Sequence, residues 1–316
     1  SVTPGAMMVG AVRTLRRRRP AIIYDADGLP ADERLEFGGW RRRDPRYLLF
    51  RALERAAVRS ADAVITRSAS ASVPLSARTG RDRAGFTVVV NGREAPAAAD
   101  LSLEARAAVR ERLGVGPDTP LLAYAGSIGD QYLPDDMFRF VSAVAAHRPD
   151  AHLAVFTAEQ HHARIHQLAA EYRVGNLTVD SLAPADVSMH LAACDLGIAL
   201  RRASVSQQAV APIKVAEYLL CGLPVLFSPG VGDLDTQLTG SVAHAMSAGD
   251  DSDGAARWFV DDVLPSRESI RNTATALGRA EFSLARGADG YRRAFRLAQA
   301  ASGRPTAARN GSSQRS

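Results

Sequence analysis

Short apolar runs alternate along the chain with segments in which apolar residues recur three and four positions apart. A short apolar run rich in β-branched residues is typical of a buried strand, and the longer period is typical of one face of a helix. Strands that alternate with helices predict a parallel sheet with crossover helices. The expected strands form two series, the first at residues 21–25, 61–66 and 86–90 and the second at residues 121–125, 152–156, 177–180, 195–200 and 223–227.

The segments between the strands carry the helical pattern. Asn91-Gly92 is a turn signal at the end of the first series, and a linker rich in Ala and Pro follows at residues 95–102. Beyond Gly254 the chain is expected to be helical and to end in a long amphipathic segment. Helices are expected at residues 46–60, 70–80, 135–146, 164–172, 184–193, 213–221 and 282–301.

The two series differ in length, which predicts unequal domains. Five strand–helix units make a complete doubly wound domain, whereas the first series has too few strands for one. We therefore predict an α/β fold with two Rossmann-like domains, the N-terminal one incomplete. The expected parts are a partial N-terminal domain at residues 1–100, a second domain at 101–281, a terminal helix at 282–301 and a disordered tail at 302–316.

Composition limits the class of protein. The 316 residues, 46% of them hydrophobic, can bury a sizeable core. No apolar run approaches the roughly 20 residues that span a bilayer, and the start of the chain lacks the features of a signal peptide, so a cytoplasmic location is expected. Cys194 and Cys221 lie in apolar segments without metal-ligand spacing and are expected to be buried free thiols.

The net charge of +5 is unevenly distributed, with arginine runs at residues 16–19 and 41–43. No aromatic platform interleaves with these runs and no nucleic-acid-binding module is recognisable, so a nucleic-acid partner is not expected. An anionic membrane surface, or an anionic substrate carried on one, is the better partner, and it would place the protein at the inner face of the membrane. A solvated arginine-rich face is the alternative.

Lys214 is the only lysine in a chain whose other basic residues are arginine. Pro212 can begin a helix, which would put Lys214 in the first turn, where a cation opposes the helix dipole unless an anion lies nearby. Glu217 follows three residues later on the same helical face, and its carboxylate could accept two hydroxyl hydrogen bonds. A solvated lysine and an ordinary ion pair between Lys214 and Glu217 are the alternatives.

Two glycine-containing loops follow expected strands, at residues 126–130 and 228–232. Ligands of open parallel sheets bind beyond the carboxyl ends of the strands, and glycine lets the main chain approach a phosphate closely. Each loop could equally serve turn geometry alone. His161, His162 and His166 include a pair at zinc-binding spacing but no third ligand, so a solvated helix face is expected there, with no metal and no cofactor.

Residues 212–225, PIKVAEYLLCGLPV, resemble the donor-site signature of GT-B glycosyltransferases, close to the retaining enzymes of family 4 (glycosyl transferases group 1). Further segments similar to that family lie at residues 61–68, 88–92, 124–127 and 281–291. The resemblance implies a GT-B fold and transfer of a sugar, with retention, from a nucleotide diphosphate sugar to a hydroxyl of a glycan, lipid or small-molecule acceptor. It also implies that residues 282–301 cross back to the N-terminal domain.

The resemblance also implies roles for single residues. Glu217 would bind the ribose and Lys214 the diphosphate, with Gly126 and Ser127 against the phosphates. The nucleobase would pack against residues 181–184. Arg201 or Arg202 is a further diphosphate candidate, with a solvated loop arginine as the alternative.

The acceptor side is less defined. Asp25 and Asp27 end the first expected strand, with Glu33 and Glu36 beyond, and such acids could orient an acceptor hydroxyl; we take Asp27, with Lys214, as the catalytic candidates. A turn-forming Asp-Gly is the alternative. Ala209 stands where the family often has a second acid, and no glycine-rich loop or histidine precedes Ala21. These departures leave two other functions open, a non-catalytic GT-B nucleotide-binding partner and a nucleotide-sugar epimerase.

Overall fold

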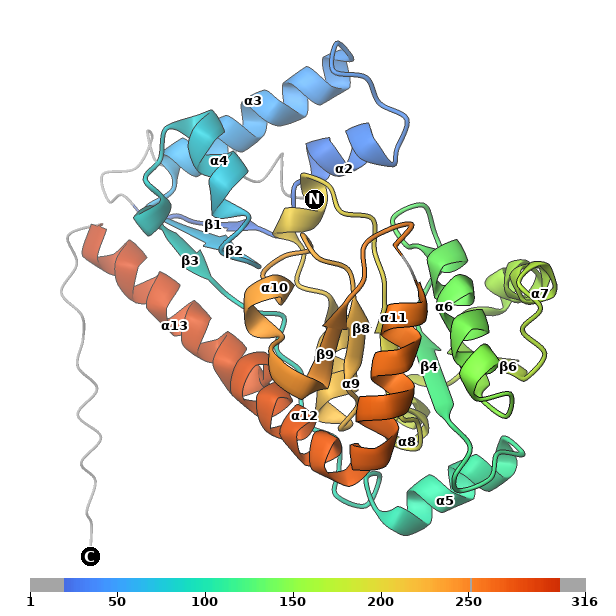
Figure 1. Ribbon diagram of the computed structural model, residues 1–316. Coiled ribbons are helices and arrows are strands. Elements are labelled where there is room, and N and C mark those ends of the chain that lie inside the picture. The colour runs from blue at the N-terminus through green and yellow to red at the C-terminus, as the bar shows by residue number, and fades with distance from the viewer. Residues whose placement is uncertain (1–19, 251, 302–316) are drawn as a thin grey trace, which may run out of the picture.

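The computed structural model describes residues 20–250 and 252–301, which fold around two parallel sheets (Figure 1). The first sheet has the order β1-β2-β3, formed by β1 (Ile23–Ala26), β2 (Ala63–Thr66) and β3 (Phe86–Val88). The arginine run at residues 16–19 and the tail at 302–316 lie outside the described residues. Among those described, no helix is both long enough and apolar enough to cross a membrane.

The second sheet has the strand order β6-β5-β4-β7-β8-β9, with every neighbouring pair parallel. Its strands are β4 (Leu121–Ala125), β5 (His152–Phe156), β6 (Leu177–Asp180), β7 (Leu196–Ala199), β8 (Val225–Phe227) and β9 (Ala243–Ala245). The chain winds outward from β4 in one direction and then from β7 in the other. The topological switch point, where such sheets bind ligands, therefore lies beyond the carboxyl ends of β4 and β7.

Helices cover both faces of each sheet. The first sheet carries α3 and α4 on one face and α13 on the other (Figure 1). The side chains of adjacent β2 residues face opposite sides of this sheet. Val64 packs with Val58 and Leu75, whereas Ile65 packs with Ala294 of α13. The helices are α2 (Pro30–Glu36), α3 (Pro45–Ser60), α4 (Ser72–Thr79), α5 (Leu103–Arg112), α6 (Pro134–His147), α7 (His162–Glu171), α8 (Val187–Ala192), α9 (Ile213–Leu220), α10 (Leu234–Gln237), α11 (Ser252–Arg257), α12 (Arg267–Phe282) and α13 (Leu284–Ala301).

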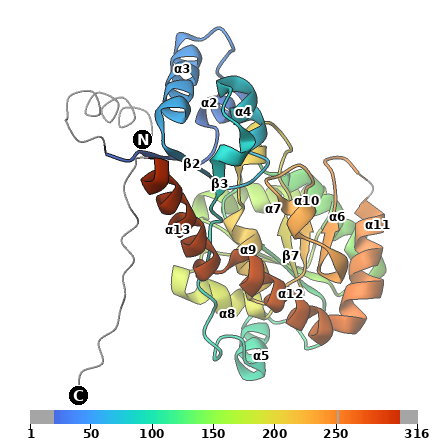
Figure 2. The same cartoon turned by 90° about the vertical axis from the view of Figure 1, so that its left-hand side faces the viewer.

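The chain crosses between the sheets twice, and the two crossings touch. After β3 it leaves the first sheet, and after α12 it returns as α13, which runs beside β2 and β3 (Figure 2). At the crossing, the Arg93 N–H donates to the Phe282 carbonyl at 2.8 Å and the Leu284 N–H donates to the Arg93 carbonyl at 2.8 Å. Gly92 lies against the Ser283 carbonyl so closely that no side chain would fit there.

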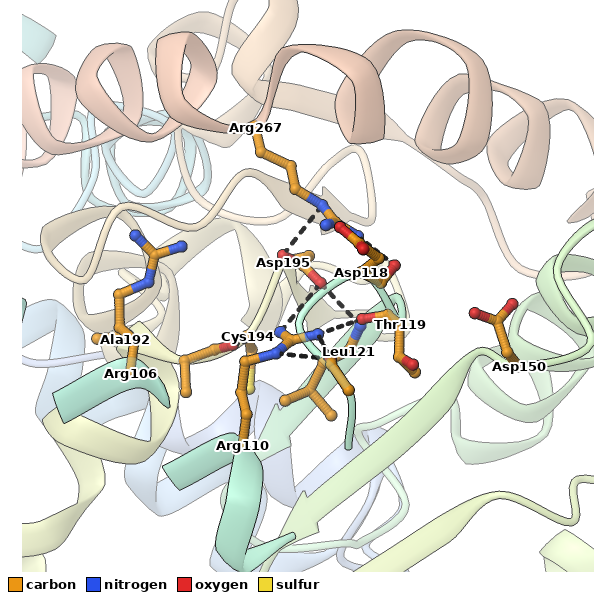
Figure 3. A network of polar contacts seen from close by, with 12 residues as sticks. Arg106, Arg110, Asp118, Thr119, Leu121, Asp150, Ala192, Cys194, Asp195 and Arg267 are labelled. Carbon is orange, nitrogen blue, oxygen red and sulfur yellow. Dashed lines mark hydrogen bonds and ion pairs between the residues drawn. The ribbon is translucent and has the colours of Figure 1, made fainter. Parts of the chain in front are cut away.

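A buried acid joins the opposite, amino-terminal ends of β4 and β7 (Figure 3). Asp195, just before β7, accepts a hydrogen bond from the Leu121 N–H at 2.8 Å. Arg110 of α5 and Arg267 of α12 approach its two oxygens at 3.5 and 3.4 Å. This network lies at the ends of the strands that point away from the switch point. It ties α5 and α12 to the two central strands.

The sequence pattern located all eight expected strands, three of them (β4, β5 and β6) with the observed bounds. The ninth, β9, was missed because it is three residues long with His244 at its centre. Helices α2, α5 and α10 were also missed, since α2 and α10 are short and α5 lies next to the Ala- and Pro-rich linker. Cys194 and Cys221 are free and buried, as expected, and burial raises the pKa of both thiols.

Candidate functional site

Helix α9 carries Lys214 and Glu217 to the switch point. Its Tyr218 side chain is fully buried and reaches under both central strands. The Tyr218 hydroxyl accepts a hydrogen bond from the Ala125 N–H at 2.8 Å and donates to the Ile198 carbonyl at 3.2 Å. This contact fixes the rotation of α9, so that Lys214, one turn earlier, lies beside the loop that follows β4.

Lys214 is buried without a hydrogen-bonding partner. The residue is 8% exposed, and its Nζ has no acceptor among the described residues. The amine lies 3.9 Å from the Tyr124 ring centroid and 4.5 Å from that of Tyr132. Burial and the neighbouring Arg201 lower its pKa to about 7, against a smaller opposite effect of Glu217. An unpaired buried ammonium is costly, and a bound anion would remove that cost. The alternative of a solvated lysine is therefore wrong.

The loop after β4 brings main chain to this amine. Gly126 has φ of 125°, a conformation that side chains disfavour, and a Cβ atom there would lie 3.5 Å from Lys214 Nζ. The Tyr124 hydroxyl donates to the Ser127 carbonyl at 2.7 Å and so shapes the turn. Gly126 thus lies directly beside the amine.

Gly126 also lines a cavity of about 430 Å³. It brings together most of the donor-site residues expected from the sequence, namely Gly126, Ser127, Ser181, Leu182, Pro184 and Glu217. Apolar residues from β4, β5 and α8 complete the lining. The cavity therefore combines a main-chain loop, an apolar wall and a carboxylate, with the Lys214 amine beside Gly126.

Glu217 pairs with Arg93 and not with Lys214. Its Oε1 lies 3.5 Å from Arg93 Nε, and no ion pair joins it to Lys214 within the described residues. Burial raises the pKa of the Glu217 carboxyl, and Arg93 and Lys214 oppose that rise. The ordinary ion pair that the spacing allowed between Lys214 and Glu217 is absent, so the Lys214 amine has no carboxylate partner among the described residues.

The neighbouring residues Arg201 and Arg202 have different surroundings. Arg201 is buried and donates to the side-chain carbonyls of Gln207 at 2.7 Å and Gln131 at 3.1 Å, with its guanidinium 4.8 Å from the Tyr132 ring centroid. The solvated alternative is therefore wrong for Arg201. Arg202 is exposed and lines a different cavity of about 560 Å³ together with Arg164. Only Arg201 lies close enough to influence Lys214.

The acids at the carboxyl end of β1 gather around an arginine that the sequence analysis missed. Arg67, just beyond β2, donates from Nε to Asp27 at 2.9 Å and from a terminal nitrogen to Asp25 at 2.8 Å. The Tyr291 hydroxyl of α13 donates to Asp25 at 3.3 Å. The only available signal was that Arg67, like the two acids, follows a strand of the same parallel sheet. Asp27 remains an acceptor-side candidate, with its side chain 65% exposed.

Two positions that the sequence analysis considered, Glu36 and Ala209, lie in contacts between the two halves of the structure. Glu36 accepts hydrogen bonds from the Ser204 hydroxyl at 2.7 Å and from the Val205 and Ser206 N–H groups at 3.1 Å, so it joins the two halves. Ala209, where the resemblance would place an acid, is buried against the first-sheet cluster that includes Leu29. No group of three possible metal ligands occurs in the described part of the chain.

Comparisons with known proteins identify the fold of the chain. No family model matches the chain, and no curated protein matches it. Its structure is similar to HepE from Anabaena solved with UDP and glucose, with a TM-score of 0.68 and 16% identity over 92% of this chain and 74% of that one. It is also similar to sucrose-phosphate synthase from Thermosynechococcus elongatus (0.65, 16% identity, 94% and 72% covered) and to WaaG, a glycosyltransferase involved in lipopolysaccharide biosynthesis (0.60, 17%, 91% and 76%). The chain therefore has the GT-B fold, as the sequence resemblance implied.

Proposed function

We propose that this chain is a glycosyltransferase that moves a sugar from a nucleotide diphosphate sugar to an acceptor hydroxyl. The observation that carries the proposal is the buried ammonium of Lys214, which has no hydrogen-bonding partner among the described residues and lies beside Gly126, a residue that lines the neighbouring cavity. HepE, which shares the fold, was solved in complex with UDP-glucose. A nucleotide diphosphate supplies the anion that this amine lacks.

The donor would lie along the cavity. Its diphosphate would meet the N–H groups of the Gly126–Ser127 turn and the Lys214 charge. The ribose hydroxyls would donate to the Glu217 carboxylate, and the base would pack on Leu182 and Pro184. This arrangement follows the order of groups in the ligand, from an anionic end to an apolar end.

Lys214 would act by stabilising the leaving group. Its pKa of about 7 leaves the amine partly neutral in the empty site, and an arriving diphosphate raises that pKa because opposite charges favour the protonated form. The fixed ammonium then opposes the negative charge that grows as the sugar departs. We include retention of configuration and an acceptor-orienting role for Asp27 in the proposal, both on the family resemblance.

We also propose the organisation and location expected from the sequence, with an acceptor-side part up to residue 100, a donor-binding part at 101–281 and the helix at 282–301 crossing back. Association with an anionic membrane fits the exposed arginines at 41–43, which lie close in sequence to the exposed Leu48 and Leu49 of α3. A cytoplasmic protein bound at the inner face would reach a lipid or glycan acceptor there.

Calorimetric titration with UDP, GDP and ADP tests the donor site, and turnover of UDP-glucose or GDP-mannose, with and without added acceptor sugars, tests the activity. Nucleotide binding without any turnover would favour the second candidate, a non-catalytic partner, to which the apolar packing of Ala209 points. Conversion of the donor to an isomer with no acceptor present would favour an epimerase. Absence of binding to all three nucleotides would reject the proposal.

A further inference from the structure

Arg93 lies in the segment that crosses from the first sheet to the second, which we call the hinge. Its side chain approaches Glu217 in the candidate site. Its main chain is hydrogen-bonded on both sides to the returning crossover, to Phe282 and Leu284. Two residues earlier, the Asn91 side chain donates to the Ala211 carbonyl at 3.1 Å, at the start of the α9 region. The hinge segment is thereby tied to the returning crossover and to the start of the helix that carries Lys214 and Glu217.

The contact between Arg93 and Glu217 is incomplete. Arg93 Nε is 3.5 Å from Glu217 Oε1, and this buried nitrogen has no hydrogen-bond acceptor among the described residues. Both side chains keep access to solvent, at 41% and 36% exposed. A buried donor without an acceptor is unfavourable, so the pair is poised to take up a group that satisfies it.

Space for such a group is present on both sides of Glu217. The 430 Å³ cavity reaches Glu217 from the Gly126 side, and a second cavity of about 600 Å³ is lined by both Glu217 and Arg93. Pro184 and Val187 line both cavities as well. A ligand bound along α9 would therefore pass beside the carboxylate and the guanidinium, within reach of both.

The chemistry of the pair selects the group. A carboxylate only accepts hydrogen bonds and a guanidinium only donates them, whereas a hydroxyl does both. A ribose with two adjacent hydroxyls can donate to Glu217 and accept from Arg93 at once. A 2′-deoxyribose keeps one hydroxyl and so offers fewer of these hydrogen bonds, and a fully ionised phosphate has no proton to donate to the carboxylate.

We propose that Arg93 completes the ribose-binding end of the site with Glu217, so that the hinge itself contributes a donor-binding residue. The inference rests on the proposed function. It assigns Arg93 a direct contact with the nucleotide and makes ribose recognition depend on the crossover that joins the two sheets.

The test compares Arg93→Ala and Arg93→Lys with the wild-type chain by titration of three probes. These are whichever of UDP, GDP and ADP binds most tightly, its 2′-deoxy form, and inorganic pyrophosphate. Arg286→Ala is the matched control, since Arg286 forms a similarly exposed ion pair with Glu281 at 3.7 Å near the same hinge. Thermal melting of each variant checks that it folds.

Arg93→Ala is expected to weaken ribonucleotide binding about tenfold, to reduce the preference for the ribo over the deoxy form, and to leave pyrophosphate binding unchanged. Arg93→Lys is expected to recover part of the loss, and Arg286→Ala to match the wild type. Unchanged nucleotide binding by Arg93→Ala, or equal loss of nucleotide and pyrophosphate, would overturn the inference while leaving the proposed function standing. Failure of the wild-type chain to bind any of the three nucleotides would overturn both.

Discussion

Lys214 Nζ lies 3.9 Å from the centroid of the Tyr124 ring, inside a site with no carboxylate in ion-pair distance among the described residues. Aromatic faces attract a cation without neutralising it. The same Tyr124 donates its hydroxyl to the Ser127 carbonyl. One side chain therefore supports both the charge and the loop that lines the cavity.

Substitution of Lys214 by Ala is expected to lower turnover about a hundredfold or more, because it removes a fixed charge beside the leaving group. The fold should persist, since the amine makes no hydrogen bond that its loss would leave broken. Steady-state kinetics together with a thermal melt check both parts. Turnover within a few fold of wild type would contradict the role.

The stability of the empty protein is expected to rise with pH between about 7 and 10. The pKa of Lys214 is about 7 in the folded chain and 10.5 in the unfolded chain. Between these values the unfolded state binds more protons, so the free energy of unfolding rises with pH. The gain from one such group is at most about 1.4 kcal/mol per pH unit.

Urea unfolding at several pH values, compared with Lys214→Met, isolates this contribution from that of the tyrosines and cysteines. Methionine keeps most of the apolar volume and removes the titration. The wild-type slope should exceed the slope of the variant throughout the window. Parallel slopes would show that Lys214 is not desolvated as described.

Glu217→Gln is expected to weaken nucleotide binding about tenfold while leaving turnover at saturating donor less affected. The amide keeps the shape but replaces one strong acceptor and loses the charge that favours hydroxyl donors. Calorimetry gives the affinity, and kinetics at high donor concentration give the turnover. Equal affinity for wild type and variant would remove Glu217 from the site.

Gly126→Ala is expected to destabilise the chain by about 1 kcal/mol and to weaken nucleotide binding, because a side chain is disfavoured at φ of 125° and would narrow the approach to Lys214. Gly129→Ala is the control, since a methyl group there meets nothing within 4 Å. Chemical denaturation and nucleotide titration of both variants decide the matter. Identical behaviour of the two would show that Gly126 has no special part.

Asp195→Ala is expected to cost about 3 kcal/mol of unfolding free energy, because it leaves the partly buried cations of Arg110 and Arg267 without their acid. Nucleotide affinity should be unchanged when measured well below the melting temperature, because the network lies at the opposite ends of the strands from the candidate site. A large loss of affinity in a fully folded variant would contradict that separation.

Local patterns in the sequence were sufficient for strands β1 to β8 and for α9. A buried parallel strand needs a continuous apolar run, and the lone Lys214 stood out against the arginines. The partners Tyr124, Tyr132, Arg67 and Arg93 could not be predicted, because they reach the sites from other elements and only the packing of the chain decides where they point. Arg201 and Arg202 show the same limit, since consecutive residues at the end of a strand face opposite sides and composition does not tell which side is inward.

The return of α13 to the first sheet means that the residues before the crossing do not complete the core of that sheet by themselves. Ile65 and Val89 are covered by Ala294, which the chain supplies only in its last described helix. A protein shortened before Leu284 would leave this apolar surface bare, so attempts to separate the first sheet from the second must keep the final helix with the first sheet or supply it as a separate peptide.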